Sequence, residues 1–477
     1  MGIYVNPTGR SFELAINSEI FVDKSGLIKE TNKCINTLQR YMCVSRPRRF
    51  GKSMAMDMLS AYYGRKTDAE NLFKGLKISH DESYDRHINK YDVLKINMQD
   101  FLSVTHSVDD MLKMLCEYIT DDFSIECKDI IFRDKSNIVR VMQDVFMSTG
   151  RPFVILIDEW DCLFREFTQD KEAQKKYLDF LRGWLKDKDY IALAYMTGIL
   201  PIKKYGSHSA LNMFTEYSMT DMGALAEYFG FTDDEVKQLC KKYDRDYEAV
   251  KNWYDGYSFK GVASVYSPRS VVSSMRLGEI GNYWNQTETF EALQIYIDMN
   301  FEGLRDDILS MIAGETVPVN TRSFTNDMTT FRTEDDVLTL LIHLGYLGYH
   351  YSARSVFIPN DEIRAEYVNA VSVSDWGEVS KALKNSADTL QAIWQGREKQ
   401  VAEGIRQAHF ETSHTQYNDE NALSYTISLA LYAARNFYTV HRELSGGKGF
   451  ADLVFIPRKR FADKPALVVE LKWNKDA

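Results

Sequence analysis

Three consecutive residues near the amino end, Gly51, Lys52 and Ser53, have the types and the order of a phosphate-binding loop. Free backbone N–H groups at the start of a helix form an anion site, and the helix dipole adds partial positive charge there. The Lys52 ammonium would lie over the β- and γ-phosphates of a nucleotide, and the Ser53 hydroxyl would be a ligand of Mg²⁺. The triplet therefore predicts binding of a nucleoside triphosphate with its magnesium ion.

The residues on either side of the triplet have the patterns of a strand and a helix. Met42–Val44 is a short apolar run typical of a buried strand. The apolar residues after the triplet recur at helical spacing: Met54, Ala55, Met58, Leu59 and Tyr62. Strand, turn and helix are the context that a phosphate-binding loop requires. However, Arg46 stands where the full pattern has its first glycine, and Pro47 removes one N–H group. An ordinary strand-to-helix turn is therefore the alternative.

Two acidic residues, Asp158 and Glu159, follow the uninterrupted apolar run Phe153–Ile157. Such a run is typical of a strand buried on both faces of a parallel sheet, and ligands of open α/β folds bind at the carboxyl ends of these strands. Asp158 would hold Mg²⁺ through water, and Glu159 would polarise the water that attacks the γ-phosphate. A solvated acidic turn after a strand is the alternative interpretation.

A further apolar run, Ile191–Met196, ends at Thr197 and Gly198. Thr197 would contact the γ-phosphate if this strand lay between the other two, and a threonine that caps a turn is the alternative. Helical patterns separate the apolar runs, among them Val108–Ile119, which begins with a capping-box spacing. Alternating strands and helices predict a parallel sheet with helices on both faces.

The composition indicates a soluble globular protein. Of the 477 residues, 44% are hydrophobic and 26% are charged, and no apolar run reaches the roughly 18 residues of a membrane span. The N-terminal residues lack the pattern of a secretory signal, so we expect a cytoplasmic protein without a membrane partner. The six cysteines have no C-x-x-C spacing, which predicts reduced thiols rather than a zinc site. The net charge of −10 permits only a local nucleic-acid groove.

Six motifs resemble those of a bacterial family of AAA-ATPase-like proteins that carry a C-terminal PD-(D/E)XK nuclease-type domain. They are FVDKSGLI (21–28), SRPRRFGKSM (45–54), ILIDEWD (155–161), MTGI (196–199), NWYDGYSF (252–259) and VYSP (265–268). An arginine in place of the first loop glycine is usual in that family. The resemblance implies a P-loop core in which an additional strand separates the Lys52 strand from the Asp158 strand.

The resemblance also implies ATP and Mg²⁺ as cofactors. Glu159 would be catalytic, and Ser53 and Asp158 would bind the metal. The residues implied to bind the nucleotide are Arg49, Phe50, Gly51, Lys52, Ser53, Met54, Asp158 and Thr197. Arg48 and Arg49 would face either the phosphates or a neighbouring subunit of a homo-oligomer, two alternatives that the sequence leaves open.

The middle of the chain, residues 221–372, has the patterns of a helical region. The aromatic residues around Gly256 would form either a lid near the nucleotide or a packing corner between domains, and the second is favoured because aromatic residues dominate core burial. Between Glu334 and Val371, a helix, two short strands and a helix suggest a winged-helix-like unit. Few of its residues are basic, which favours a structural role over DNA binding.

Near the carboxyl end, Asp452, Glu470 and Lys472 have the order of a PD-(D/E)XK site. On a predicted strand Ala466–Leu471, Glu470 and Lys472 would share one face, toward Asp452 on a neighbouring strand. Asp452 and Glu470 would bind Mg²⁺, with Glu420 as a further ligand. Lys472 would position or deprotonate the water that attacks a phosphodiester. A hairpin with a surface Glu–Lys pair is the alternative.

We therefore expect an α/β protein of three parts. Residues 1–220 would form the P-loop domain, residues 221–372 the lid and winged-helix-like region, and residues 373–477 the nuclease-like domain. The family continues past the point where this sequence stops, so we expect either a truncated sequence or a copy that has lost the edge of this domain, and the nuclease activity is in question. The expected function is Mg²⁺-dependent ATP hydrolysis coupled to cleavage of nucleic acid, DNA rather than RNA. The alternatives are an ATP-dependent switch or scaffold that does not cleave, and a loop that does not bind ATP.

Overall fold

The chain forms two units in this computed structural model. The first comprises residues 1–283 and 318–360, and the second comprises residues 284–317 and 361–477. The expected three-part division does not coincide with these units and stays a prediction. The structure describes residues 2–202, 211–284, 290–299, 301–325, 331–373, 377–412, 420–446, 449–458 and 461–472. No helix within these residues is both long and apolar enough to cross a membrane.

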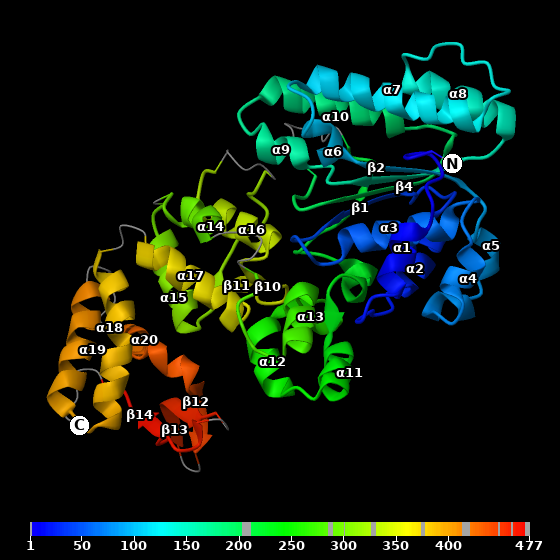
Figure 1. The fold of residues 1–477 in the computed structure, drawn as a ribbon. Coiled ribbons are helices and arrows are strands. Elements are labelled where there is room, and N and C mark those ends of the chain that lie inside the picture. Colours follow the sequence, from blue (N-terminus) through cyan, green and yellow to red (C-terminus); the bar gives the residue numbers. More distant parts are fainter. Residues whose placement is uncertain are drawn as a thin grey trace. The chain divides into compact units, whose positions relative to one another are not determined.

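A five-stranded parallel sheet is the centre of the first unit (Figure 1). Its strand order is β2-β3-β4-β1-β5, so β4 lies between β1 and β3 as the resemblance implied. The bounds are β1 Tyr41–Ser45, β2 Asp92–Asn97, β3 Phe153–Asp158, β4 Ile191–Gly198 and β5 Thr215–Tyr217. Every residue of β1, β3 and β4 is buried, which explains their uninterrupted apolar runs.

Helices cover both faces of this sheet, as the alternating pattern predicts (Figure 1). One face carries α1 (Arg10–Ile16), α2 (Gly26–Cys34), α3 (Lys52–Tyr63), α4 (Ala69–Phe73), η1 (Lys77–His80) and α5 (Tyr84–His87). The other carries α6 (Met98–Leu102), α7 (Val108–Glu126), α8 (Ile138–Thr149), α9 (Cys162–Glu166) and α10 (Lys171–Leu185). The Ser107 side chain caps α7 by accepting a hydrogen bond from the Asp110 amide.

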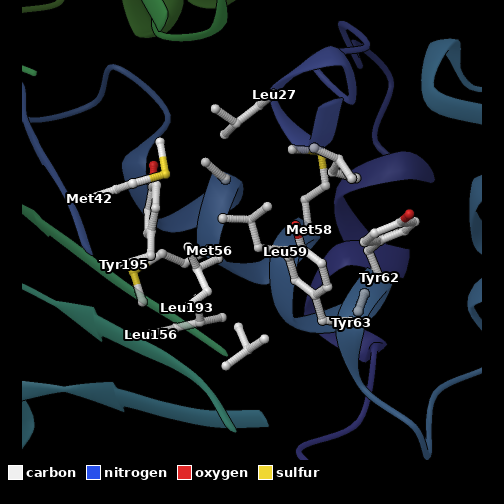
Figure 2. Close-up of a cluster of buried hydrophobic side chains, with 14 of the residues drawn as sticks. Leu27, Met42, Met56, Met58, Leu59, Tyr62, Tyr63, Leu156, Leu193 and Tyr195 are labelled. Carbon is white, nitrogen blue, oxygen red and sulfur yellow. The ribbon is translucent and has the colours of Figure 1, made fainter. Parts of the chain in front are cut away.

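Helix α3 is held against the sheet by a large apolar cluster (Figure 2). Met56 and Leu59 of α3 lie beside Leu156 of β3 and Tyr195 of β4, and all four are fully buried. Removal of such side chains costs about 2–5 kcal/mol each, so this cluster fixes the start of α3 relative to the sheet. Met54, in the first turn of α3, lies outside this cluster and is 47% exposed.

The rest of the first unit follows the sheet. A short antiparallel sheet, β6-β8-β7, packs with three helices, and a second short sheet has the strand order β10-β11-β9. Within the predicted helical region, residues Met222–Phe229 contain a 3₁₀ helix. The bounds are η2 Gly223–Tyr228, β6 Phe231–Thr232, α11 Asp233–Tyr243, α12 Tyr247–Tyr254, β7 Tyr257–Phe259, β8 Val262–Tyr266, α13 Pro268–Leu277, β9 Val317–Pro318, α16 Glu334–Leu344, β10 Gly348–His350 and β11 Ser355–Phe357.

The second unit combines helices with a three-stranded antiparallel sheet, β12-β13-β14. It contains α17, so the expected winged-helix-like segment divides between the two units. The bounds are α14 Phe290–Ile297, α15 Leu304–Ala313, α17 Asp361–Val373, α18 Gly377–Trp394, α19 Glu398–Thr412, α20 Glu420–Ala430, η3 Tyr432–Asn436, β12 Tyr438–Gly446, β13 Gly449–Pro457 and β14 Leu467–Val469.

Candidate nucleotide site

The turn between β1 and α3 has the backbone form of a phosphate-binding loop. β1 ends at Ser45, and α3 begins at Lys52, so its first N–H groups lie beside the carboxyl end of the sheet. Gly51 has φ 88°, a left-handed backbone conformation that residues with a Cβ atom rarely adopt. The expected strand, turn and helix are therefore confirmed.

Lys52 reaches back over this turn. Its ammonium group donates hydrogen bonds of 2.9 Å to the carbonyl oxygens of Arg46 and Pro47, and the residue is only 4% exposed. Burial lowers the pKa of Lys52, whereas the nearby carboxylates of Glu159 and Asp158 raise it. The loop therefore holds the ammonium group at its centre, where a phosphate group could take the place of the carbonyl oxygens.

Asp158, the last residue of β3, accepts hydrogen bonds from two of the expected site residues. The Ser53 hydroxyl donates a bond of 2.6 Å to Asp158 Oδ2, and the Thr197 hydroxyl donates to Oδ1. The Glu159 amide also donates to Oδ1, at 2.9 Å. A hydroxyl and a carboxylate oxygen this close are the ligands that Mg²⁺ prefers, so the residues present fit the ion.

Thr197 is a strand residue rather than the cap of a turn. It lies in β4, between β1 and β3, and is fully buried. The turn interpretation of this residue is therefore wrong. The central position of β4 brings its carboxyl end between the loop and Asp158, as the γ-phosphate role requires.

Glu159 follows directly on β3 and is paired with Arg165. The Arg165 guanidinium donates to the Glu159 carboxylate, and 22% of the glutamate side chain is exposed. Burial raises the pKa of Glu159, whereas Arg165 and Lys52 lower it. The backbone of Glu159 has φ 48°, a conformation that is uncommon for residues other than glycine. Such backbone strain concentrates at functional sites.

Asp161 is a site residue that the sequence analysis missed. Its buried carboxylate accepts hydrogen bonds from the amides of Ile199 (3.0 Å) and Leu200 (2.8 Å). A Cβ atom at Gly198 would lie 2.6 Å from Asp161 Oδ1. The final acid of the ILIDEWD motif was the available signal. Asp161 thus ties the end of β4 to the turn that carries Glu159, and Gly198 provides the room.

A cavity of about 550 Å³ opens beside the loop. This volume lies within the range of small-molecule sites. Of the residues expected to bind the nucleotide, Arg49, Phe50, Gly51 and Met54 line it. Other lining residues come from the N-terminal segment, η2, β6 and α13, including Phe21, Val22, Lys24, Tyr228, Phe231, Arg269 and Val272. Phe21, Val22 and Lys24 belong to the motif FVDKSGLI, but the sequence analysis gave none of these residues a binding role, because they meet only in the folded chain.

The expected nuclease residues lie in the second unit. The Leu471 amide donates a hydrogen bond of 2.6 Å to Asp452 Oδ2, so Asp452 lies beside residues 470–472. The expected strand Ala466–Leu471 is wrong at its end, because β14 stops at Val469, where its pairing with β13 ends. Glu470 and Lys472 are therefore exposed residues beyond the strand. Glu420 is the first residue of α20, and its side chain lies outside the described part of the chain.

These residues do not form a metal site in the part of the chain that the structure describes. No group of three or more His, Cys, Asp or Glu side chains that could hold a metal ion occurs there. The nuclease site therefore stays a prediction.

The N-terminal region also matches a known family. Residues 10–207 match the model of the family described as predicted AAA-ATPase. Over these residues, the chain is similar to the AAA-ATPase-like family. The matched range begins with α1 and includes the Lys52 loop, Asp158, Glu159 and Thr197. This AAA-ATPase-like match ends before β5, so it does not describe the second unit.

A curated relative extends the similarity beyond this range. The chain is 26% identical over 280 residues to an uncharacterized protein of the vnfD 5′ region of Azotobacter chroococcum mcd 1. The match covers 56% of this chain and 51% of the relative. The matched region thus spans about half the length of that protein.

Solved structures resemble the chain only distantly. Cdc6p from Pyrobaculum aerophilum has a TM-score of 0.28 at 8% identity, with 77% of this chain and 98% of that chain covered. The Aeropyrum pernix ORC2 protein, solved as ADPNP–ADP complexes, has a TM-score of 0.32 at 11% identity, with 74% and 96% covered. The assignment of the fold depends on the strand order described above rather than on these similarities.

Proposed function

We propose that the first unit binds ATP with Mg²⁺ at the loop between β1 and α3 and hydrolyses it. One observation carries the proposal: the Ser53 hydroxyl and the Asp158 carboxylate meet at 2.6 Å, beside the buried Lys52. These are the cation ligands and the ammonium group that a magnesium–triphosphate unit requires. The match of residues 10–207 to a predicted AAA-ATPase family supports the same activity.

Each side chain of the site would have its own role in ATP hydrolysis. Lys52 would exchange the carbonyl oxygens of Arg46 and Pro47 for phosphate oxygens. Ser53 and Asp158 would hold Mg²⁺, which, when bound, neutralises charge on the phosphates. Glu159 would accept a hydrogen bond from the attacking water and orient it toward the γ-phosphate.

The cavity beside the loop would hold the nucleoside. Gly51 of the phosphate loop lines the cavity, so a nucleotide with its phosphates on the loop could extend its nucleoside into it. The apolar lining includes Phe21, Met54 and Tyr228. Flat apolar surfaces suit the faces of a purine base, and a few polar groups suffice to orient it. Lys24, which lines the cavity, is held in place by a 2.5 Å ion pair with Glu235.

Thermal unfolding with and without Mg-ATP tests the proposal. A ligand at 100 times its dissociation constant stabilises the folded state by about 2.7 kcal/mol, which is a measurable rise in melting temperature. We expect this rise in the wild type and in the control Lys113→Ala, an exposed lysine of α7, and no rise in Lys52→Ala. An equal rise in Lys52→Ala, or none in the wild type, would contradict ATP binding at this loop.

A second candidate function is Mg²⁺-dependent cleavage of nucleic acid, DNA rather than RNA, by the second unit. The contact between Asp452 and the Leu471 amide supports it, because it brings Glu470 and Lys472 near this acid. Incubation of the full chain with duplex DNA, single-stranded DNA and RNA in Mg²⁺ tests the idea. Cleavage that is lost in Asp452→Ala and retained in the control Asp463→Ala, an exposed acid of the same unit, is the expected result. Equal cleavage by both variants, or no cleavage by the wild type, would contradict a nuclease site at Asp452. The ATP-dependent switch or scaffold would then be the remaining interpretation.

A further inference from the structure

Arg46 is fully buried, although it occupies the position of the first glycine in the usual loop pattern. Its guanidinium donates hydrogen bonds to the Phe229 carbonyl oxygen (2.9 Å) and to the Met219 sulfur (3.0 Å). Both acceptors lie more than 170 residues away in the sequence, in the segment that follows β5. The side chain therefore points away from the loop and into a neighbouring part of the first unit.

Aromatic rings enclose the same guanidinium. It lies 4.1 Å from the ring centroid of Phe259 and 5.6 Å from that of Phe50. Phe50, which is itself a loop residue, packs edge-on against Tyr257 with ring centroids 5.2 Å apart. Cation–π contacts strengthen when the cation is desolvated, as it is here. Two loop residues, Arg46 and Phe50, are thus fixed against β7.

No carboxylate forms an ion pair with Arg46 within the described residues. Burial lowers the pKa of Arg46 to about 9. A buried charge that is stabilised by carbonyl groups, a thioether sulfur and aromatic rings, but by no carboxylate, is destabilising relative to an apolar residue of similar size. Simple filling of space would therefore favour an apolar side chain, and the guanidinium has another use.

The main chain of Arg46 links this anchor to the proposed phosphate site. Its amide donates to the Gly198 carbonyl oxygen at 3.0 Å, next to Thr197. Its carbonyl oxygen accepts one of the two hydrogen bonds of Lys52. One residue therefore connects the end of β4, the loop lysine and the segment 219–259.

We infer that Arg46 is a positioning residue that sets the shape of the phosphate loop by anchoring it to residues 219–259. In the usual pattern, a glycine supplies the backbone freedom that the loop needs. Here the buried Arg46 side chain fixes the first turn of the loop instead. It thereby also fixes the carbonyl oxygens of Arg46 and Pro47, whose hydrogen bonds Lys52 must break to bind phosphate. This inference rests on the proposed ATP site.

The test compares the affinity for Mg-ATP, the Michaelis constant and the melting temperature of four proteins. Arg46→Lys keeps a positive charge but loses the planar fork that contacts Met219 and Phe229. The matched control is Arg245→Lys, in which the original guanidinium donates to the Met275 carbonyl oxygen of the same unit. Phe259→Leu removes the ring beneath the guanidinium and leaves Arg46 in place.

We expect the dissociation constant and the Michaelis constant for Mg-ATP to rise about tenfold in Arg46→Lys, which corresponds to the loss of one charged hydrogen bond. A smaller rise is expected in Phe259→Leu, and none in Arg245→Lys. If Arg46→Lys does not fold, the result for Phe259→Leu decides alone. If Arg46→Lys and Phe259→Leu both have lower melting temperatures but an unchanged affinity for Mg-ATP, the role of Arg46 is purely structural and the inference is overturned.

Hydrogen exchange gives an independent readout. Binding of Mg-ATP should change the exchange of amides in residues 219–230 of the wild type and of Arg245→Lys, and should leave them unchanged in Arg46→Lys at saturating nucleotide. An equal change in all three proteins would overturn the inference. If the wild type does not bind Mg-ATP at all, the proposed function fails, a result distinct from normal binding of Mg-ATP by both the wild type and Arg46→Lys.

Discussion

The Ser53 hydroxyl donates a 2.6 Å hydrogen bond to the Asp158 carboxylate across 105 residues of sequence. The bond joins the first turn of α3 to the end of β3, with β4 between β3 and the strand that precedes α3. A cation that entered this site would find both oxygens already in place. The binding of Mg²⁺ would then carry no free-energy cost for bringing these two ligand oxygens together.

Replacement of Ser53 by alanine tests this preformed pair. The change removes one hydrogen bond and one metal ligand, so we expect a loss of about 1 kcal/mol in unfolding free energy. We also expect the Mg²⁺ concentration that half-saturates ATP hydrolysis to rise. The matched control is Ser60→Ala, because Ser60 is a buried residue of the same helix whose hydroxyl has no partner among the described residues. An equal Mg²⁺ requirement in both variants would contradict the role of Ser53.

Replacement of Glu159 by glutamine separates binding from hydrolysis. Glutamine keeps the size of the side chain but cannot act as a base, so the turnover number should fall by at least about 100-fold. The rise in melting temperature with Mg-ATP should persist, because the residues that hold the phosphates are unchanged. Phosphate release and thermal unfolding measured on one preparation check both statements. Unchanged turnover would exclude Glu159 as the catalytic base.

The pH dependence of hydrolysis should reveal the pair of Glu159 and Arg165. Glu159 must be ionised to act as a base, and burial raises its pKa, so activity should be lost as the pH falls through that pKa. Arg165 and Lys52 oppose this effect, whereas Asp161 and Asp158 add to it. Arg165→Gln removes the strongest opposing charge, and the acidic limb of the activity profile should move to higher pH.

The control for this shift is Arg133→Gln, which breaks an arginine–carboxylate pair with Asp144 outside the site. Its acidic limb should coincide with that of the wild type. The interpretation fails if both variants move the limb equally, because the change would then reflect general stability.

Asp233 should make the stability of the first unit depend on pH. Burial raises the pKa of its carboxyl group, but hydrogen bonds from Lys237, Tyr247 and Tyr266 outweigh burial and lower the pKa from 3.8 to about 2. The stabilisation is therefore complete above about pH 4 and is lost as the pH falls toward 2. At pH 7, Asp233→Asn should lower the unfolding free energy by about 1 kcal/mol, since the site is partly exposed.

Urea unfolding at pH 7 and at low pH checks this prediction. Asp234→Asn, at the exposed neighbouring position of α11, is the control and should have little effect. The difference between wild type and Asp233→Asn should shrink as the pH falls. A difference that stays constant with pH would exclude ionisation of Asp233 as its cause.

Much of the first unit could be predicted because its signals are local. A strand buried on both faces must be apolar throughout, so Phe153–Ile157 and Ile191–Met196 identified β3 and β4 within two residues. The residue types at Lys52, Ser53, Asp158 and Thr197 then predicted a candidate site at the carboxyl ends of the strands, since parallel strands present these ends at one edge.

What the sequence did not reveal depends on distant contacts. The partners of Arg46 are about 180 residues away, and nothing in the loop itself indicates that its side chain is buried. The motif ILIDEWD marks Asp161 as an acid near the site, but it does not reveal that Asp161 accepts hydrogen bonds from amides beyond β4. In the second unit, the short strand β14 ended before Glu470 because pairing with β13, rather than composition, sets its length. Tertiary structure thus decided these cases.

The left-handed backbone conformation of Glu159 lowers the stability of the folded chain, because a residue with a Cβ atom is strained there. Glycine would adopt that conformation with less strain, yet it has no carboxylate to orient a water molecule. Selection for thermostability alone should therefore favour small or flexible residues at this position and produce robust, inert proteins. Under the proposed function, a chain that keeps glutamate there retains a locally unfavourable backbone geometry together with the carboxylate that orients water.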